Sequence, residues 1–248
     1  MSNLFTYTLR IADSSLILGQ RMSMWCSKGP TLEEDIALSN IALDMFGQAN
    51  GFYEYAAQLD GTKSADDLAF KRNEREFFNH QMVEIENGHF GHTITRNFLH
   101  DTFNFLFYTQ LSKSKDETLS ALATKSLKEV KYHLRHSTNW LIRLGDGTEK
   151  SNAKVQKSLD HIWQFTAELF EMDSIDTELL NAGIGVNNAA LKNQWDDIVN
   201  TTLKKAKLSR PEDEYMATGG KKGMHTEYLG FILAEMQYLQ RAYPDAKW

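Results

Sequence analysis

The fold class is decided by the stretch PTLEEDIALSNIALDMFGQ, residues 30–48. Thr31 is a good helix N-cap, and the acidic Glu33 and Glu34 in the first turn suit the positive end of a helix dipole. Apolar side chains then recur at helical spacing, and we expect them to form a buried face: Ile36, Leu38, Ile41, Leu43 and Phe46. The pattern predicts a helix from residue 32 to about residue 59.

The same helical periodicity continues on both sides of this stretch. A short helix rich in charge is expected over residues 66–79. The longer helices are expected over residues 4–26, 90–111, 116–144, 149–170, 189–206 and 225–243. The chain has only 3 Pro and 15 Gly, and scarce helix breakers favour long helices over many short strands. The sequence therefore predicts an all-α bundle of four long helices with accessory helices.

Composition limits the possible classes of protein. Hydrophobic residues make up 42% of the 248 residues, which is enough for a continuous core, and no linker or repeat interrupts the chain. We therefore expect a single domain over residues 1–248. The net charge of -6 and the lack of a basic stripe argue against nucleic acid as a partner. The single cysteine, Cys26, and the absence of a long apolar run predict a cytoplasmic protein without a membrane span.

Some helical bundles hold two iron ions, which suggests a test of the sequence. Such sites take one carboxylate from each of two helices and a Glu-x-x-His pair from each of the other two. No Asp or Glu occurs between Ser14 and Leu32, so the first helix offers a ligand only if Asp13 serves. At the Glu-x-x-His spacing the second helix has Met45 and Gln48, which are poor ligands for a hard iron centre.

The third and fourth helices keep part of the expected ligand set. Asp101 lies in the third, and the fourth has Val130 and His133 at the Glu-x-x-His spacing. Glu129 is one residue out of register, about 100° around the helix. We interpret Met45, Gln48, Asp101, Val130 and His133 as the positions of a vestigial metal site that holds no metal.

The polar side chains that remain at these positions need partners if they are buried without a metal. We expect Asp44, Gln48, Asp101 and His133 to form an interior polar remnant, joined by hydrogen bonds or by an arginine or lysine. A second acidic group, Glu76 and Glu84 with His80, lies in a charged segment, and we interpret it as solvated rather than as a metal site.

Several long segments resemble one family. They are the stretch over residues 30–44, KEVKYHLRHS at 128–137, RLGDGTE at 143–149, HTE at 225–227 and AEMQYLQRAYP at 234–244. They are similar to the C-subunit (PaaC) family of the bacterial phenylacetyl-CoA epoxidases, which are ferritin-like proteins. The resemblance extends over nearly the whole chain and implies an all-α, ferritin-like helical bundle with accessory helices.

The resemblance also implies a function and partners. The A subunit of that complex is the iron-binding, oxygen-activating paralogue, and it has Asp-Glu-x-x-His where this chain has residues 44–48. Its fourth helix reads Lys-Glu-Glu-Ser-Phe-His against residues 128–133 here. The resemblance thus implies a non-catalytic subunit without a cofactor, which supports the catalytic A subunit. A further small subunit and a reductase using NADPH complete the complex, which epoxidises phenylacetyl-CoA with oxygen.

Two alternatives stay open at this point. The chain could be a self-sufficient metal-dependent oxidase that uses unusual ligands such as Glu129, His133 and Asp101. It could instead be a CoA-ester binding module. In that case the loop Gly219-Gly220-Lys221-Lys222-Gly223 would bind phosphate through backbone N–H groups and through Lys221 and Lys222.

Overall fold

The computed structural model describes residues 2–244 and 246, and within these residues it contains helices and no strands. The all-α prediction is confirmed, and the long helix pairs are those of a ferritin-like bundle with accessory helices. The chain divides into two compact units, residues 1–86 with 219–248 and residues 87–218. The single-domain organisation stays a prediction.

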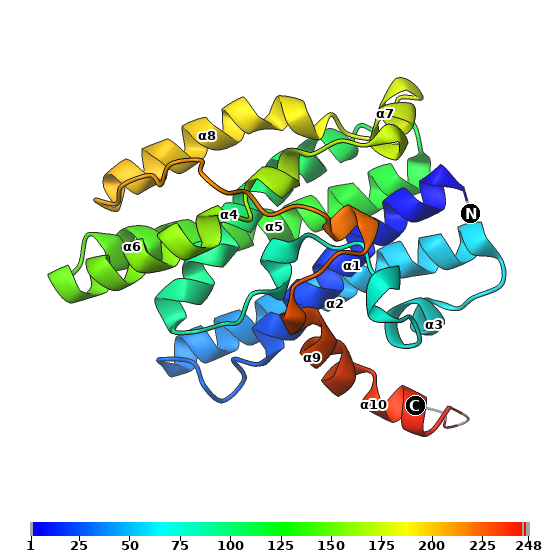
Figure 1. Cartoon of the computed structure of the whole chain (residues 1–248), viewed down its shortest axis with the longest axis horizontal. Coiled ribbons are helices and arrows are strands. Elements are labelled where there is room, and N and C mark those ends of the chain that lie inside the picture. Colours follow the sequence, from blue (N-terminus) through cyan, green and yellow to red (C-terminus); the bar gives the residue numbers. More distant parts are fainter. Residues whose placement is uncertain (1, 245, 247–248) are drawn as a thin grey trace. The chain divides into compact units, whose positions relative to one another are not determined.

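Unit 1 is built on the long helices α1 (Asn3–Ser23) and α2 (Leu32–Asp60), which lie side by side (Figure 1). The Thr31 side chain caps α2 by accepting from the Glu34 N–H, as the sequence predicts. The two helices approach closely at Gly19, where a Cβ atom would lie 3.0 Å from Phe46 Cε1 and 3.2 Å from Met45 Cβ. A larger residue at position 19 would therefore push α1 and α2 apart.

Shorter elements complete unit 1. They are α3 (Ala65–Phe70), η1 (Glu74–Glu76), η2 (Gln81–Glu84), η4 (Gly220–Lys222), α9 (Glu227–Met236) and α10 (Tyr238–Ala242). The C-terminal α9 packs against α1, η1 and η2, although it comes about 140 residues later than η2 in the chain. Helix α9 is therefore part of the same core as α1.

Unit 2 is built on a second long pair, α4 (Phe90–Leu111) and α5 (Glu117–Gly145). The accessory helices are α6 (Glu149–Trp163), η3 (Ala167–Phe170), α7 (Ser174–Asn181) and α8 (Asn188–Lys205). Trp195 of α8 is buried and donates its indole N–H to the Leu99 carbonyl of α4 at 3.0 Å. This bond fixes α8 on the main helix pair.

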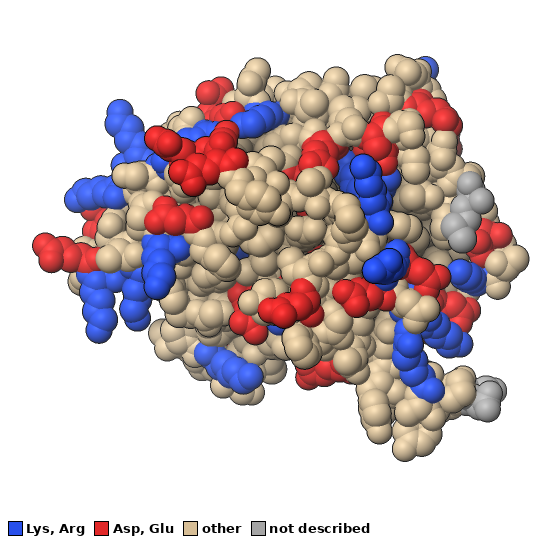
Figure 2. Space-filling view, viewed as in Figure 1, with Lys and Arg blue, Asp and Glu red and all other residues tan. Residues whose placement is uncertain are grey.

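The charged surface mixes both signs. On the face shown in Figure 2, Lys and Arg side chains gather over the end where Figure 1 places α6 and α8, with acidic side chains among them. This face of the described residues therefore carries no continuous basic stripe. None of the described helices is long and apolar enough to cross a membrane.

Three expectations about local structure are wrong. The helix expected over residues 66–79 ends at Phe70, and the chain continues in coil and the η1 turn. The helix expected over residues 149–170 ends at Trp163, and η3 follows it. The helix expected over residues 225–243 is interrupted at Gln237 between α9 and α10, where the Gln237 side-chain amide donates to the Ala69 and Arg72 carbonyls.

The buried face predicted for α2 is only partly correct. Leu38 and Ile41 are buried, but Ile36 is 54% exposed and Leu43 is 65% exposed. Phe46 is half-buried. The helix carries apolar residues on its inner and its outer face, so periodicity alone does not separate the two. Its outer face is consequently rich in exposed apolar groups, which is a common property of surfaces that bind a partner.

Candidate functional site

The residues of the predicted vestigial site belong to two different helix pairs. Met45 and Gln48 lie on α2 in unit 1 and are 3% and 6% exposed. Asp101 of α4 with Val130 and His133 of α5 lie in unit 2 and are also buried. All five side chains therefore point into the protein rather than to solvent. Their convergence on one interior stays a prediction.

In unit 2 the buried acid is satisfied by a neighbouring hydroxyl. Ser137, one turn after His133 on α5, donates to the Asp101 carboxylate at 2.8 Å. Burial raises the pKa of Asp101 from 3.8 to about 6, and the nearby His133, Ser137, His136 and Arg96 act in the opposite direction. Asp101 is thus held by α5 through hydrogen-bond and electrostatic contacts that need no metal.

A second polar group lies on the same face of α4. Arg96 is fully buried and donates to Asn87 Oδ1 at 3.1 Å and to Asn97 Oδ1 at 3.4 Å. His100, one turn later, has its pKa lowered to about 3 by burial and by the positive charge of Arg96, so its ring is neutral. The interior of unit 2 therefore contains a fixed arginine cation close enough to affect both His100 and Asp101.

In unit 1 the predicted remnant is less buried. Asp44 is half-exposed, whereas Gln48 is buried, and both have interaction partners within the described structure. Asp44 therefore lies at the border between the buried and the exposed face of α2. The proposal that Asp44, Gln48, Asp101 and His133 form one interior network stays a prediction.

Asp13, the one acid near the first helix that was considered as a ligand, is fully engaged elsewhere. Its buried carboxylate accepts from Tyr53 Oη at 2.6 Å, from Phe78 N at 2.8 Å and from both terminal nitrogens of Arg72. The charge of Asp13 outweighs the burial of Arg72 and raises the pKa of that guanidinium. Asp13 therefore anchors the segment after α3 to α1 and α2.

The interpretation of Glu84 as a solvated residue is wrong. Its carboxylate is fully buried and accepts from His225 Nδ1 at 2.6 Å, Thr226 N at 2.8 Å and Asn79 Nδ2 at 2.8 Å. Glu76, by contrast, is exposed, and His80 is half-buried. Glu84 was misjudged because its main partners follow it by more than 140 residues, and no local pattern reveals them.

The glycine-lysine loop is a compact turn. Lys221 is half-buried and Lys222 is exposed, both within η4. Gly223 has φ +71°, and a Cβ atom there would lie 2.3 Å from the Arg75 carbonyl oxygen, so only glycine fits. The loop is shaped by its packing on η1, and its role in binding CoA phosphates stays a prediction.

The donor set does not fit a two-iron centre. Met45 offers a thioether and Val130 a hydrocarbon where carboxylates are needed, and Asp13 is occupied by four donors. Among the described residues, no three His, Cys, Asp or Glu side chains are grouped so that they could hold a metal ion. The sequence analysis missed three polar residues of this interior, Ser137, Arg96 and His100. Arg96 could have been recognised, because it is a basic residue within an apolar helix.

Replacing Asp101 by asparagine should change how stability depends on pH. Because the pKa of Asp101 in the folded chain is about 6, above the ordinary 3.8, its stabilising contribution is present below about pH 4 and is lost as pH rises to 6. An asparagine side chain at this position does not titrate and can still accept from Ser137. We expect the Asp101→Asn chain to gain up to about 3 kcal/mol relative to the original chain between pH 4 and 7.

Urea denaturation at a series of pH values measures this difference. Asp146→Asn is the matched control, since Asp146 is an exposed partner of Lys207. A stability difference for Asp101→Asn that stays constant across this pH range would show that the buried carboxyl does not titrate there.

Known proteins match this chain over its full length. The model of the family described as "Phenylacetic acid catabolic protein" matches residues 1–248. The chain is 47% identical over 248 residues to the C subunit of 1,2-phenylacetyl-CoA epoxidase from Escherichia coli (strain K12), and the match covers 100% of both chains. The resemblance noted in the sequence is confirmed. The chain belongs to the phenylacetic acid catabolic protein family.

Proposed function

We propose that this chain is the non-catalytic structural subunit of a 1,2-phenylacetyl-CoA epoxidase complex that acts in aerobic phenylacetate degradation. The observation that carries the proposal is the full-length, 47% identity to a protein named as the C subunit of that enzyme. The match leaves no part of either chain uncovered, so it concerns the complete relative rather than a shared module.

The chemistry of the substituted positions supports a structural role. Iron that activates oxygen depends on carboxylate ligands, and this chain has Met45, Gln48 and Val130 at three of the positions where such a site needs a Glu-x-x-His ligand. Asp101 is hydrogen-bonded to Ser137 and Asp13 to Arg72 and Tyr53. These bonds stabilise the helices and leave the acids unsuited to bind iron.

The proposal assigns the reaction to other chains. The iron would be bound by a catalytic A subunit, and a reductase would deliver electrons from NADPH. A further small subunit would complete the complex, in the cytoplasm. The contribution of this chain would be a stable helical surface against which the catalytic subunit packs. Its exposed apolar residues on α2, Ile36 and Leu43, suit such a contact.

Co-expression with the candidate catalytic subunit, followed by metal counting, tests this function. We expect the two chains to co-purify in a fixed ratio, with iron in proportion to the catalytic subunit only. Replacing the catalytic subunit's own Glu-x-x-His residues should then remove the iron from the complex. Stoichiometric iron in this chain alone, or its failure to co-purify, would contradict the proposal.

A further inference from the structure

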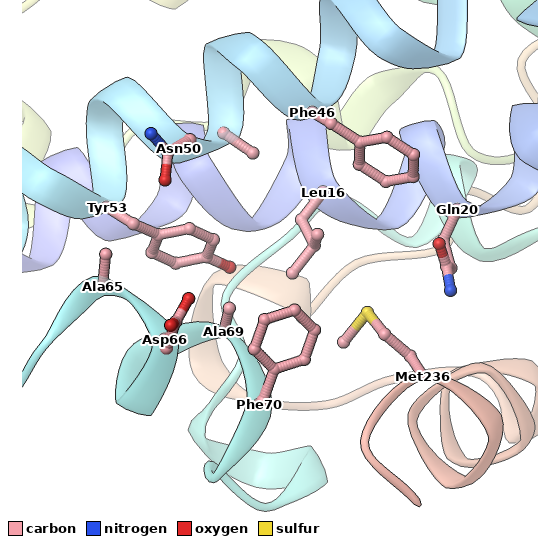
Figure 3. Close-up of a pocket in the computed structure, with 11 residues that line it drawn as sticks. Leu16, Gln20, Phe46, Asn50, Tyr53, Ala65, Asp66, Ala69, Phe70 and Met236 are labelled. Carbon is pink, nitrogen blue, oxygen red and sulfur yellow. The ribbon is translucent and has the colours of Figure 1, made fainter. Parts of the chain in front are cut away.

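Unit 1 contains an open pocket that is lined by none of the residues of the predicted vestigial site. It has a volume of about 390 Å³ and is lined by side chains of α1, α2, α3 and α9. In Figure 3, the side chains of α1 and α2 enter the space from one side, those of α3 from the other, and Met236 reaches it from α9. The volume is within the usual range of ligand pockets.

The lining combines aromatic rings with one negative charge. The rings are those of Phe46, Tyr53 and Phe70, and Leu16 and Met236 add aliphatic surface. Among the described residues that line the pocket, Asp66 is the one charged side chain, and no lysine, arginine or histidine is present. Such a pocket favours an apolar group that carries a positive charge, and it disfavours phosphates and carboxylates.

Two cations next to the pocket, Arg72 and Lys71, are each paired with an aspartate. Tyr53 donates its hydroxyl hydrogen to Asp13 at 2.6 Å and accepts from Arg72 at 3.2 Å, so its polar end is occupied and its ring borders the pocket. Lys71, at the end of α3, pairs with Asp67 at 2.8 Å. Asp66 itself is exposed at the start of α3. Its charge is therefore available to an incoming cation.

We propose that this pocket binds an arginine side chain presented by the catalytic partner subunit. An arginine fits because its stem is aliphatic and its planar guanidinium stacks on aromatic rings and is weakly hydrated. The Asp66 carboxylate complements the charge of the guanidinium at the mouth of the pocket. The proposal rests on the proposed function, because it assigns a contact surface to the same partner.

The pocket is continuous with the exposed apolar face of α2. Phe46 and Asn50, which line it, follow Leu43 by three and seven residues and so lie on the same side of the helix. Gly47, between them, has open space beside it, since a Cβ atom there would meet nothing within 4 Å beyond its own turn of helix. A partner helix crossing α2 at Gly47 can therefore contact Leu43 and place a long side chain in the pocket.

A matched pair of small probes tests the charge preference of the pocket. The full chain, labelled at its methionine methyl groups, would be titrated by NMR with n-butylguanidinium and with its neutral analogue n-butylurea. Met236 reports on the pocket, and Met82, which is fully buried and does not line it, is the internal control. We expect the Met236 signal to shift while the Met82 signal does not. The guanidinium should bind about tenfold more tightly than the urea.

Three variants define the expected result. Asp66→Asn should bring the affinities of the two probes close together, and Phe70→Leu should weaken binding of both. Glu227→Gln removes the same charge from an exposed position of α9 outside the pocket and should change neither. Equal affinities of the two probes for the original chain, or no shift of Met236, would overturn the proposal.

The complex separates this proposal from the proposed function. We expect Asp66→Asn to weaken binding of the co-expressed catalytic subunit by about tenfold, while Glu227→Gln leaves it unchanged. Equal binding by both variants would refute the arginine pocket and leave the structural-subunit function standing. Failure of the original chain to bind the catalytic subunit would refute both.

Discussion

Asp13→Asn is expected to lower the free energy of unfolding by about 3–5 kcal/mol, the usual cost of removing one partner from a buried ion pair. The Asp13 carboxylate is fully buried and accepts from Tyr53, Phe78 and Arg72. An asparagine has the same shape, but its amide nitrogen would face donors, and the Arg72 guanidinium would remain buried without its counter-charge.

Chemical denaturation of the two chains measures the effect. Asp146→Asn is again the control, because the side chains of Asp146 and Lys207 are 47% and 73% exposed, and such pairs contribute at most about 1 kcal/mol. Arg72→Met fills a similar volume but leaves the Asp13 carboxylate buried without its counter-charge, so it should be costly as well. If Asp13→Asn proved no more costly than Asp146→Asn, the anchoring role of the pair would be refuted.

Glu84→Gln is expected to lower the free energy of unfolding by a similar amount, and the size of this loss should depend on pH. His225 is placed between two acceptors, Glu84 Oε1 at 2.6 Å and the Phe77 carbonyl oxygen at 2.8 Å. The ring can donate to both acceptors at once only when both of its nitrogens are protonated. Burial opposes this charge, but the hydrogen bond and the charge of Glu84 outweigh it and raise the pKa of His225. Glu84→Gln would leave that buried cation unpaired.

The direction of the pH dependence follows from the raised pKa. The stability that His225 contributes is fully present below about pH 6.5, its ordinary value, and is lost as pH rises through the pKa of the folded chain. The stability difference between the original chain and Glu84→Gln should therefore be largest in mild acid and shrink above neutrality. Glu227→Gln, exposed nearby, is the control. A difference that grew with pH would contradict the protonated His225.

Local signals explain why the long helices could be predicted. Thr31, Asp116 and Thr148 each accept from a backbone N–H in the first turn of the helix that follows, so the start of each helix is determined by neighbouring residues. The prediction that Met45 and Val130 occupy former ligand positions likewise rests on spacing alone, because residues three apart share a helix face, and it stays a prediction. Their burial agrees with that reasoning.

The failures of prediction in the segment after α3 concern partners distant in the chain. A helix was expected to continue to residue 79, and Glu84 was expected to be solvated. Instead Arg72 binds Asp13, 59 residues earlier, and Glu84 binds His225, 141 residues later. These two pairs draw charged residues into the core and replace the expected helix with short turns. In the same way Ser137 was not recognised as the partner of Asp101, which lies 36 residues before it on a different helix.

The exposed apolar face of α2 suits the proposed role of this chain as a subunit. Ile36 and Leu43 were expected inside because periodicity identifies apolar residues without telling which neighbour covers them. In a subunit that packs against a larger partner, such residues are covered only in the complex. We accordingly propose that the pocket beside Phe46 binds the partner rather than a free metabolite.

The measurement that tests the account most directly is turnover by the purified chain on its own. The chain would be supplied with ferrous iron, oxygen, NADPH, the reductase and phenylacetyl-CoA, and consumption of the CoA ester would be followed. The account predicts no consumption above that of the reductase alone, and turnover once the catalytic subunit is added. Turnover of phenylacetyl-CoA by this chain without the catalytic subunit would contradict the claim that it is a structural partner.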